Sequence, residues 1–297
     1  MVKVTVPASS ANLGPGFDCL GLALGCYVTL YAAPKAEGFE ITGCPVAYRN
    51  EDNLAVRAFQ AAQQHLGSTG GARLHIVSDI PVASGLGSSA ALLVAGLVAA
   101  CALHGRDVPK LELLQLATAL EGHPDNVAPA LLGGLQAGVM ADNQVYCVAN
   151  ALHPAWRFVA LIPPFKLSTK QTRAALPASV SRADAVFNLS RVALLLGAFK
   201  QGDGELLRAA MQDKLHQPHR FPLIPDGNAV QELALAQGAD ACCISGAGPT
   251  LLAVGHAGFE PALERVMAAQ HPTWRVLPLC VDMQGARVQP HSFPNGT

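Results

Sequence analysis

Alternating and continuous runs of apolar residues divide the chain into strands and helices. Val2–Val6 alternates apolar and polar positions, the pattern of a strand with one buried face. Leu74–Ser78 is rich in branched residues and predicts another strand, whereas the unbroken apolar stretch Ala90–Leu103 predicts a buried helix. Leucines at helical spacing follow Pro109 and predict an amphipathic helix that ends near Gly122. The chain therefore mixes strands and helices from its first residues onward.

The second half continues this mixture after a weak break. Arg157–Ile162 predicts a strand that the two following prolines close, and Asp184–Phe199 predicts a strongly apolar helix. We therefore expect a first domain over residues 1–155, a second over 156–290 and a flexible tail over 291–297.

A glycine- and serine-rich stretch separates the predicted strand Leu74–Ser78 from the buried helix. Its glycines would let backbone N–H groups converge, and Ser88 or Ser89 would cap the helix, whose free N–H groups and positive dipole end then face the loop. Such an arrangement favours phosphate binding. A P-loop would carry a Lys where Ser88 stands, so this is a different phosphate loop. The alternative is a tight turn that binds nothing.

The full stretch resembles the ATP-binding signature of the galactokinase, homoserine kinase, mevalonate kinase and phosphomevalonate kinase superfamily, the GHMP kinases. Every position of Pro-x-x-x-Gly-Leu-Gly-Ser-Ser-Ala-Ala is present. The resemblance implies that ATP binds at Pro81, Val82, Ala83, Ser84, Gly85, Leu86, Gly87, Ser88, Ser89, Ala90 and Ala91.

A long polar loop is expected between the first two strands, from Pro7 to Asp18. Asn, Gly, Pro and Asp have ordinary turn roles, but loops of this length are often functional. The segment resembles the first signature of homoserine kinases, Pro-Ala-Ser-x-Ala-Asn-Leu-Gly-x-Gly-Phe-Asp. The resemblance implies that Asn12 and Asp18 contact homoserine.

A second polar island, Glu121 to Asn126, interrupts an apolar region. Read alone, Asp125 could cap the next helix and His123 could be an ordinary loop residue. Beside a phosphate loop, Glu121 is the best candidate for Mg²⁺, which prefers one or two carboxylates plus phosphate oxygens. The island resembles the homoserine kinase segment Glu-Gly-His-x-Asp-Asn-Val-Ala-Pro. The resemblance implies a metal site at Ser88 and Glu121, and it places His123 and Asp125 at the substrate.

Three segments of the second half carry further candidates. Ser-Thr-x-x-x-Arg-x-x-Leu-Pro resembles a family segment whose arginine binds the substrate carboxylate, which implies that role for Arg173 and a weaker one for Thr169. A similar segment implies that Arg220 reaches the same carboxylate. Ser-Gly-x-Gly-Pro-Thr, otherwise a β-turn, matches the third superfamily signature and places Gly246 and Gly248 at the nucleotide.

The resemblance extends over nearly the whole chain and implies a two-domain α+β fold. A ribosomal-protein-S5-like nucleotide-binding domain would be followed by a ferredoxin-like α/β domain. The implied reaction is ATP-dependent phosphorylation of the side-chain hydroxyl of L-homoserine, a step of threonine biosynthesis, with ATP and Mg²⁺ as cofactors. Asp125, Asn126 and Arg173 are the expected catalytic residues. Other superfamily members use an Asp base, here Asp125, whereas homoserine kinases are also proposed to work without a dedicated base.

Composition excludes other classes of protein. Only 14% of the 297 residues are charged, the net charge is −1 and no block of Lys or Arg occurs, so nucleic acid is not an expected partner. The most apolar run is shorter than the roughly 20 residues that span a bilayer, so no membrane partner is expected either. Eight scattered cysteines without a Cys-x-x-Cys pair favour the reducing cytoplasm, with neither disulfides nor zinc. The sequence does not decide whether the protein forms a homodimer.

Two alternatives to this hypothesis come from different classes. One is a related kinase that acts on a sugar or on mevalonate, against which the paired anchors Asn12/Asp18 and Arg173/Arg220 favour a zwitterionic substrate. The other is a catalytically inactive nucleotide-binding regulator on the same scaffold, against which every candidate polar group is present. Turnover of homoserine with Mg-ATP separates these hypotheses.

Overall fold

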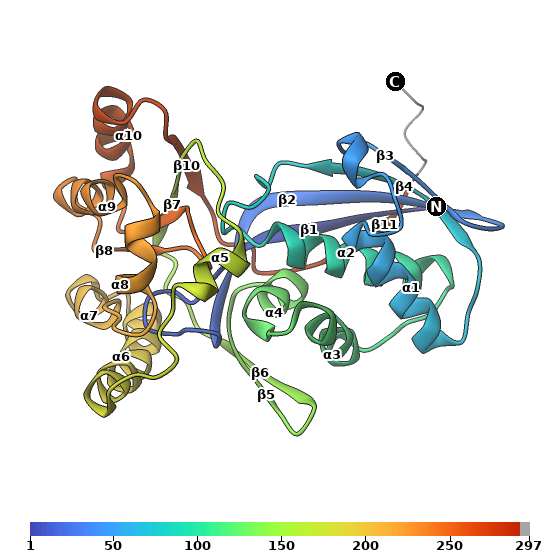
Figure 1. Cartoon of the computed structure of the whole chain (residues 1–297), viewed down its shortest axis with the longest axis horizontal. Helices are drawn as coiled ribbons and strands as arrows, with labels where there is room; N and C mark the ends of the chain where they lie inside the picture. The colour runs from blue at the N-terminus through green and yellow to red at the C-terminus, as the bar shows by residue number, and fades with distance from the viewer. Residues whose placement is uncertain (292–297) are drawn as a thin grey trace.

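The computed structural model describes residues 1–291 and arranges them as two layered units that lie next to each other (Figure 1). One unit holds the N-terminal strands and the helices up to α4. The other begins at β7. Within residues 1–291, no helix combines the length and the apolar character that a membrane crossing requires.

The first unit is built on a sheet with strand order β11-β1-β2-β4-β3, in which β5 pairs with both β2 and β6. Its pairs are antiparallel except β3 with β4. The strands are β1 (Val2–Ala11), β2 (Leu20–Lys35), β3 (Phe39–Thr42), β4 (Gly71–Ser78), β5 (Leu135–Ala141), β6 (Gln144–Asn150) and β11 (Arg287–Pro290).

Helices cover one face of this sheet (Figure 1). α2 packs on β1 and β2 and is flanked by α1, α3 and α4, so it has neighbours on every side. This burial explains why its sequence is apolar all round rather than amphipathic. The elements are η1 (Val46–Tyr48), α1 (Leu54–Leu66), α2 (Ser88–Leu103), α3 (Lys110–Glu121) and α4 (Pro124–Leu132).

The second unit contains an antiparallel sheet of order β10-β7-β9-β8. Its strands are β7 (Arg157–Ile162), β8 (Ala241–Ile244), β9 (Leu251–Gly255) and β10 (Arg275–Leu279). The chain order β7, helices, β8, β9, α10, β10 in this arrangement is the ferredoxin-like pattern, so the expected fold class is confirmed.

Helices lie against both faces of the second sheet, and the strands alternate accordingly. Val159 and Leu161 pack with the apolar residues of α9 and α10. Phe158 and Ala160 belong to the core that contains residues of α6 and α7 and continues into the first unit. The helices are α5 (Thr169–Ala174), α6 (Arg182–Gln201), α7 (Gly204–Ala210), α8 (Gln217–Arg220), η2 (Phe221–Leu223), α9 (Gly227–Ala236) and α10 (Phe259–Gln270).

The structure corrects the expected second domain at its end. β11, within the expected range 156–290, leaves the second unit and pairs with β1 in the first sheet. The chain passes from the first unit to the second between β6 and β7, and we propose residue 155 in this connection as the domain boundary. Of the expected tail, 292–297 lies outside the described residues.

Two local expectations are also wrong. β1 continues to Ala11 because its register against β2 persists beyond an irregularity at Pro7/Ala8, so the polar loop is shorter than expected. Neither Ser88 nor Ser89 caps α2. Gly87, in the left-handed conformation, occupies the cap position, so the helix has no side-chain cap.

Candidate functional site

One pocket collects residues from both units. Its walls come from the β1–β2 loop, the phosphate loop (residues 79–87), the α3–α4 junction, α5, α8 and the β8–β9 loop. The predicted residues that line it are Asn12, Asp18, Ala83, Ser84, Gly85, Gly87, Ser88, Ser89, Glu121, His123, Asp125, Asn126, Thr169, Arg173, Arg220, Gly246 and Gly248.

Five residues of the predicted ATP stretch do not line this pocket. Leu86, Ala90 and Ala91 are fully buried in the core, so their side chains hold the loop against the protein and only backbone atoms could face a ligand. Pro81 and Val82 lie at the outer start of the loop, where the Val82 side chain is exposed.

The phosphate loop is closed by the β8–β9 loop of the second unit. Ser245 donates its hydroxyl to the Gly85 carbonyl at 2.7 Å, and the Thr250 N–H donates to the Ser84 carbonyl at 3.0 Å. Gly85 has φ +89°, and a Cβ there would overlap the Ser245 carbonyl oxygen. Glycine is therefore required both by the backbone conformation and by the close approach.

The start of α2 faces the pocket with backbone N–H groups that lack partners inside the helix. The first bond inside the helix is that of the Ala91 N–H to the Gly87 carbonyl, 2.9 Å long. The preceding N–H groups of the helix have no partner within it. A Cβ at Gly87 would overlap the Ser9 hydroxyl, so the loop packs directly on β1. Free donors and the helix dipole together make this end of α2 suited to a phosphate.

Glu121, the last residue of α3, faces the same region. Its carboxylate accepts a 2.8 Å hydrogen bond from the Ser89 hydroxyl, not from Ser88, although Ser88 also lines the pocket. Burial raises the pKa of Glu121, and the Ser89 hydrogen bond opposes that shift. A half-buried carboxylate of this kind would be stabilised by a cation, which agrees with the chemistry of the predicted Mg²⁺ ligands.

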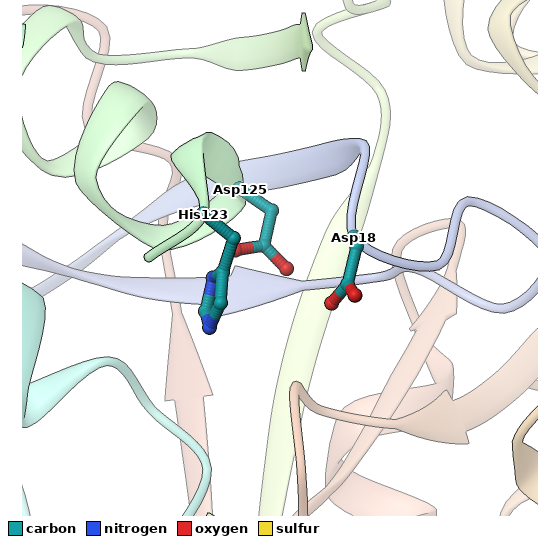
Figure 2. Close-up of side chains that lie close together, drawn as sticks. All are labelled: Asp18, His123 and Asp125. Carbon is teal, nitrogen blue, oxygen red and sulfur yellow. The ribbon is translucent and has the colours of Figure 1, made fainter. Parts of the chain in front are cut away.

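His123 and Asp125 lie at the start of α4, opposite Asp18 on the β1–β2 loop (Figure 2). His123 Nδ1 is hydrogen-bonded to the Asp125 carboxylate, and this bond is the main reason that the pKa of His123 is raised. One carboxylate oxygen each from Asp18 and Asp125 and one ring nitrogen of His123 lie within 4.8 Å of one another. The structure brings these three side chains together, and His123, not Asp125, occupies the cap position of α4.

Asp18 forms a bidentate ion pair with Arg173 of α5. The two hydrogen bonds, from Nη2 to Oδ1 and from Nη1 to Oδ2, are 2.7 and 3.0 Å long. Asp18 adopts a left-handed conformation, φ +54°, which Asp tolerates better than most residues. Its position is fixed by its N–H, which donates to the Asn12 side-chain oxygen at 3.0 Å.

Asn12 and Arg220 meet at one backbone carbonyl. The Gly246 carbonyl accepts from Asn12 Nδ2 at 2.7 Å and from Arg220 Nη1 at 2.9 Å. Both polar ends of the Asn12 amide thus bind the protein. Arg220 is only 2% exposed, and its Nε has no hydrogen-bond partner among the described residues 1–291. The pKa of Arg220 is lowered to about 10, mainly by burial and secondly by repulsion from Arg173.

Phe17 contacts both arginines of the site but is not among the residues predicted from the sequence. Its ring centroid lies 5.6 Å from the Arg173 guanidinium carbon and 5.2 Å from that of Arg220. It also stacks on His216, with 5.2 Å between ring centroids. An aromatic face between two like charges offsets their repulsion through cation–π attraction. Its place directly before Asp18 is the signal that could have identified it.

Asn126 and Thr169 complete the wall of the pocket. The Asn126 side-chain oxygen accepts from the Ser9 hydroxyl at 2.9 Å, so the start of α4 is tied to β1. Thr169 is exposed at the first position of α5.

Comparison with known proteins agrees with this architecture. The family model "GHMP kinases N terminal domain" matches residues 53–134, and "GHMP kinases C terminal" matches residues 195–270. A curated homoserine kinase of Clostridium beijerinckii is 39% identical over 97% of this chain and 98% of its own length. One from Synechococcus sp. is 45% identical over 94% of this chain and 93% of its own length.

Solved structures agree as well. The crystal structure of homoserine kinase from Cytophaga hutchinsonii superposes with a TM-score of 0.86 at 30% identity, over 97% of both chains. L. major mevalonate kinase, at 16% identity over 94% of this chain and 95% of its own, shares the fold with a TM-score of 0.74. The two curated homoserine kinases are 39% and 45% identical to the chain over nearly its whole length, so the chain belongs to the GHMP kinases and, within them, to the homoserine kinase family.

Proposed function

We propose that the chain transfers the γ-phosphate of ATP to the side-chain hydroxyl of L-homoserine, giving O-phospho-L-homoserine and ADP. The new bond joins the homoserine oxygen to the γ-phosphorus, the bond from that phosphorus to the β,γ-bridging oxygen breaks, and the hydroxyl proton is released. Catalysis of such a transfer depends mainly on positioning and on neutralisation of charge. We place the step in threonine biosynthesis and the protein in the cytoplasm.

The observation that carries this proposal is the set of opposite charges beside the phosphate loop. Asp18 supplies a carboxylate for an ammonium group, and Arg173 with Arg220 supplies guanidinium groups for a carboxylate. An α-amino acid carries both groups on one carbon. Asp18 and Arg173 bind each other, so a zwitterion bound between them would replace one ion pair by two. A neutral sugar could not make that exchange.

The phosphates would lie on the N–H groups at the start of α2. Ser88 and Glu121 would hold Mg²⁺, which supplies positive charge to the phosphate oxygens when bound. The Glu121–Ser89 hydrogen bond orients the carboxylate for this role.

The proton of the attacking hydroxyl requires an acceptor or direct release to the phosphate. Asp125 is our candidate acceptor, because its carboxylate is 3% exposed and is oriented by His123. Asn126 adjoins it at the β1 side of the pocket. An Asp125→Asn variant with kcat within about threefold of wild type would support the mechanism without a dedicated base.

A substrate panel tests the proposal. The wild-type protein with Mg-ATP should convert L-homoserine to O-phospho-L-homoserine, identified by phosphorus NMR and mass spectrometry, and should leave mevalonate and galactose unchanged. Comparable activity on mevalonate would favour a related kinase. ATP binding without turnover of any substrate would favour a nucleotide-binding regulator.

A further inference from the structure

His216 lies where the two sets of amino-acid anchors meet. Its side chain has no exposed surface. Nε2 lies 2.8 Å from the Gly14 carbonyl of the β1–β2 loop, and Nδ1 lies 3.3 Å from Nη1 of Arg220. The ring therefore connects the loop that carries Asp18 to the arginine of the second unit.

The hydrogen-bond partners fix the protonation of this ring. A carbonyl can only accept, so Nε2 carries the hydrogen that bonds to Gly14. A guanidinium can only donate, so Nδ1 must be unprotonated to accept from Arg220. The arrangement requires the neutral imidazole with its hydrogen on Nε2.

The surroundings of His216 favour the neutral form. Burial is the main cause of its lowered pKa, and the positive charge of Arg220 acts in the same direction. Asp213, whose carboxylate lies 3.5 Å from Nε2, then the hydrogen bond to Gly14 and, more weakly, Asp18 oppose the shift. The Asp213 carboxylate is engaged elsewhere, since it accepts from the N–H groups of Leu215, His216 and Gln217 and from the Asn188 amide.

Arg220 has few other supports. Within residues 1–291, its hydrogen-bond acceptors are the Gly246 carbonyl and His216 Nδ1, and both bind Nη1. Its Nε is buried without a partner. Without the acceptor on His216, the guanidinium would keep one hydrogen bond and the contact with Phe17.

We propose that His216 is a positioning residue, which aims the Arg220 guanidinium at the substrate carboxylate. The inference rests on the proposed function, because it assigns to Arg220 the carboxylate of the amino acid. The Nδ1 acceptor sets the direction of Arg220, whereas the Nε2 donor ties the ring to the β1–β2 loop.

Two substitutions separate these contributions. In His216→Asn, the side-chain oxygen is as many bonds from Cβ as Nδ1, so it can accept from Arg220 but cannot reach Gly14. In His216→Gln, the side-chain nitrogen is as many bonds from Cβ as Nε2, so it can donate to Gly14 but leaves the Nδ1 position without an acceptor. If His216 had a purely structural role, the KM for homoserine would change with the stability of each variant and not with which hydrogen bond was lost.

The measurement is steady-state kinetics with thermal unfolding on each full-length variant. We expect His216→Gln to raise the KM for homoserine about tenfold, with kcat and the KM for ATP within twofold. His216→Asn should keep the KM for homoserine within about threefold even though it loses the tie to Gly14. The control His219→Gln, on the same short helix but outside the pocket, should match wild type.

Two outcomes would overturn the inference while the proposed function stands. One is an equal KM for homoserine in His216→Gln and wild type. The other is a larger defect in His216→Asn than in His216→Gln. If only one variant folds, its KM alone decides, because the two are expected to lie on opposite sides of a threefold change. A wild-type protein that does not phosphorylate homoserine would instead refute the proposed function.

Discussion

Asp18 and Arg173 bind each other through two parallel hydrogen bonds, although 155 positions separate them in the sequence. Each side chain is about one-third exposed, 35% for Asp18 and 37% for Arg173. An ion pair in such contact with water contributes only about 0–1 kcal/mol to folding. We therefore expect its geometry to affect ligand binding more than the stability of the fold.

Arg173→Ala should separate these two effects. We expect the KM for homoserine to rise roughly 10- to 100-fold, because a hydrogen bond to a charged group contributes about 1.5–3 kcal/mol. The KM for ATP and the midpoint of thermal unfolding should change little. Steady-state kinetics with each substrate varied in turn measures the effect. Lys170→Ala, an exposed change on the same helix, is the control, and unaltered homoserine kinetics in Arg173→Ala would remove Arg173 from the site.

Glu121→Gln should weaken binding of the metal. The amide keeps the shape of the side chain but loses its charge, so the Mg²⁺ concentration for half-maximal activity should rise about tenfold or more. Burial raises the pKa of Glu121, so the proton competes with Mg²⁺ as the pH falls. Mg²⁺ affinity should therefore decrease toward acid pH in wild type and should depend less on pH in the variant. Titration calorimetry with a nonhydrolysable ATP analogue checks this, with Glu112→Gln, on the same helix, as the control.

His123 should make stability depend on pH. Its hydrogen bond to Asp125 raises its pKa above the ordinary 6.5 in the folded protein, so the folded state binds the proton more tightly. The resulting stabilisation is fully present below pH 6.5 and is lost as the pH rises through the raised pKa. The difference in unfolding free energy between wild type and His123→Gln should shrink by on the order of 1 kcal/mol from pH 6 to pH 9. Urea titrations at both pH values measure it, and a difference that grows with pH would contradict the assignment.

Gly85→Ala should damage the phosphate loop more than backbone strain alone explains. A left-handed conformation costs an L-residue roughly 1–2 kcal/mol, and overlap with the Ser245 carbonyl adds about 1–3 kcal/mol. Gly105→Ala is the matched control, since Gly105 has φ +63° but nothing within 4 Å of an added Cβ. Unfolding free energy and ATP affinity should both fall in Gly85→Ala, and only a small loss of stability is expected in Gly105→Ala. Equal losses of unfolding free energy in the two variants would mean that the phosphate loop and the β8–β9 loop are not in close contact.

Much of the fold follows from local patterns. The run Ala90–Leu103 predicts α2 because a helix that is apolar all round must be buried, and the structure surrounds it with β1, β2 and three helices. The two residues Asp142 and Asn143 predict the β5–β6 hairpin, and both adopt the left-handed conformation that such a turn requires. Patterns of this kind need no information from distant parts of the chain.

Contacts between distant segments account for what the sequence did not predict. The return of β11 to β1 depends on pairing across the whole chain, and a four-residue strand has too short a pattern to specify a partner. The positions of Phe17 and His216 become meaningful only once Asp18, Arg173 and Arg220 are adjacent. The spacing of four residues between His216 and Arg220 was a usable signal, because it places both side chains on one face of a helix.

The path of the backbone determines how the protein would respond to cleavage of a single peptide bond. The polypeptide passes from the first sheet to the second after β6 and comes back before β11, so the halves are joined by two covalent tethers and a shared core. Protease cleavage in the exposed segment near His153 and Pro154 would therefore leave two fragments that stay associated and elute as one species. The return of one short strand thus makes the enzyme a candidate for reconstitution from two separately made pieces.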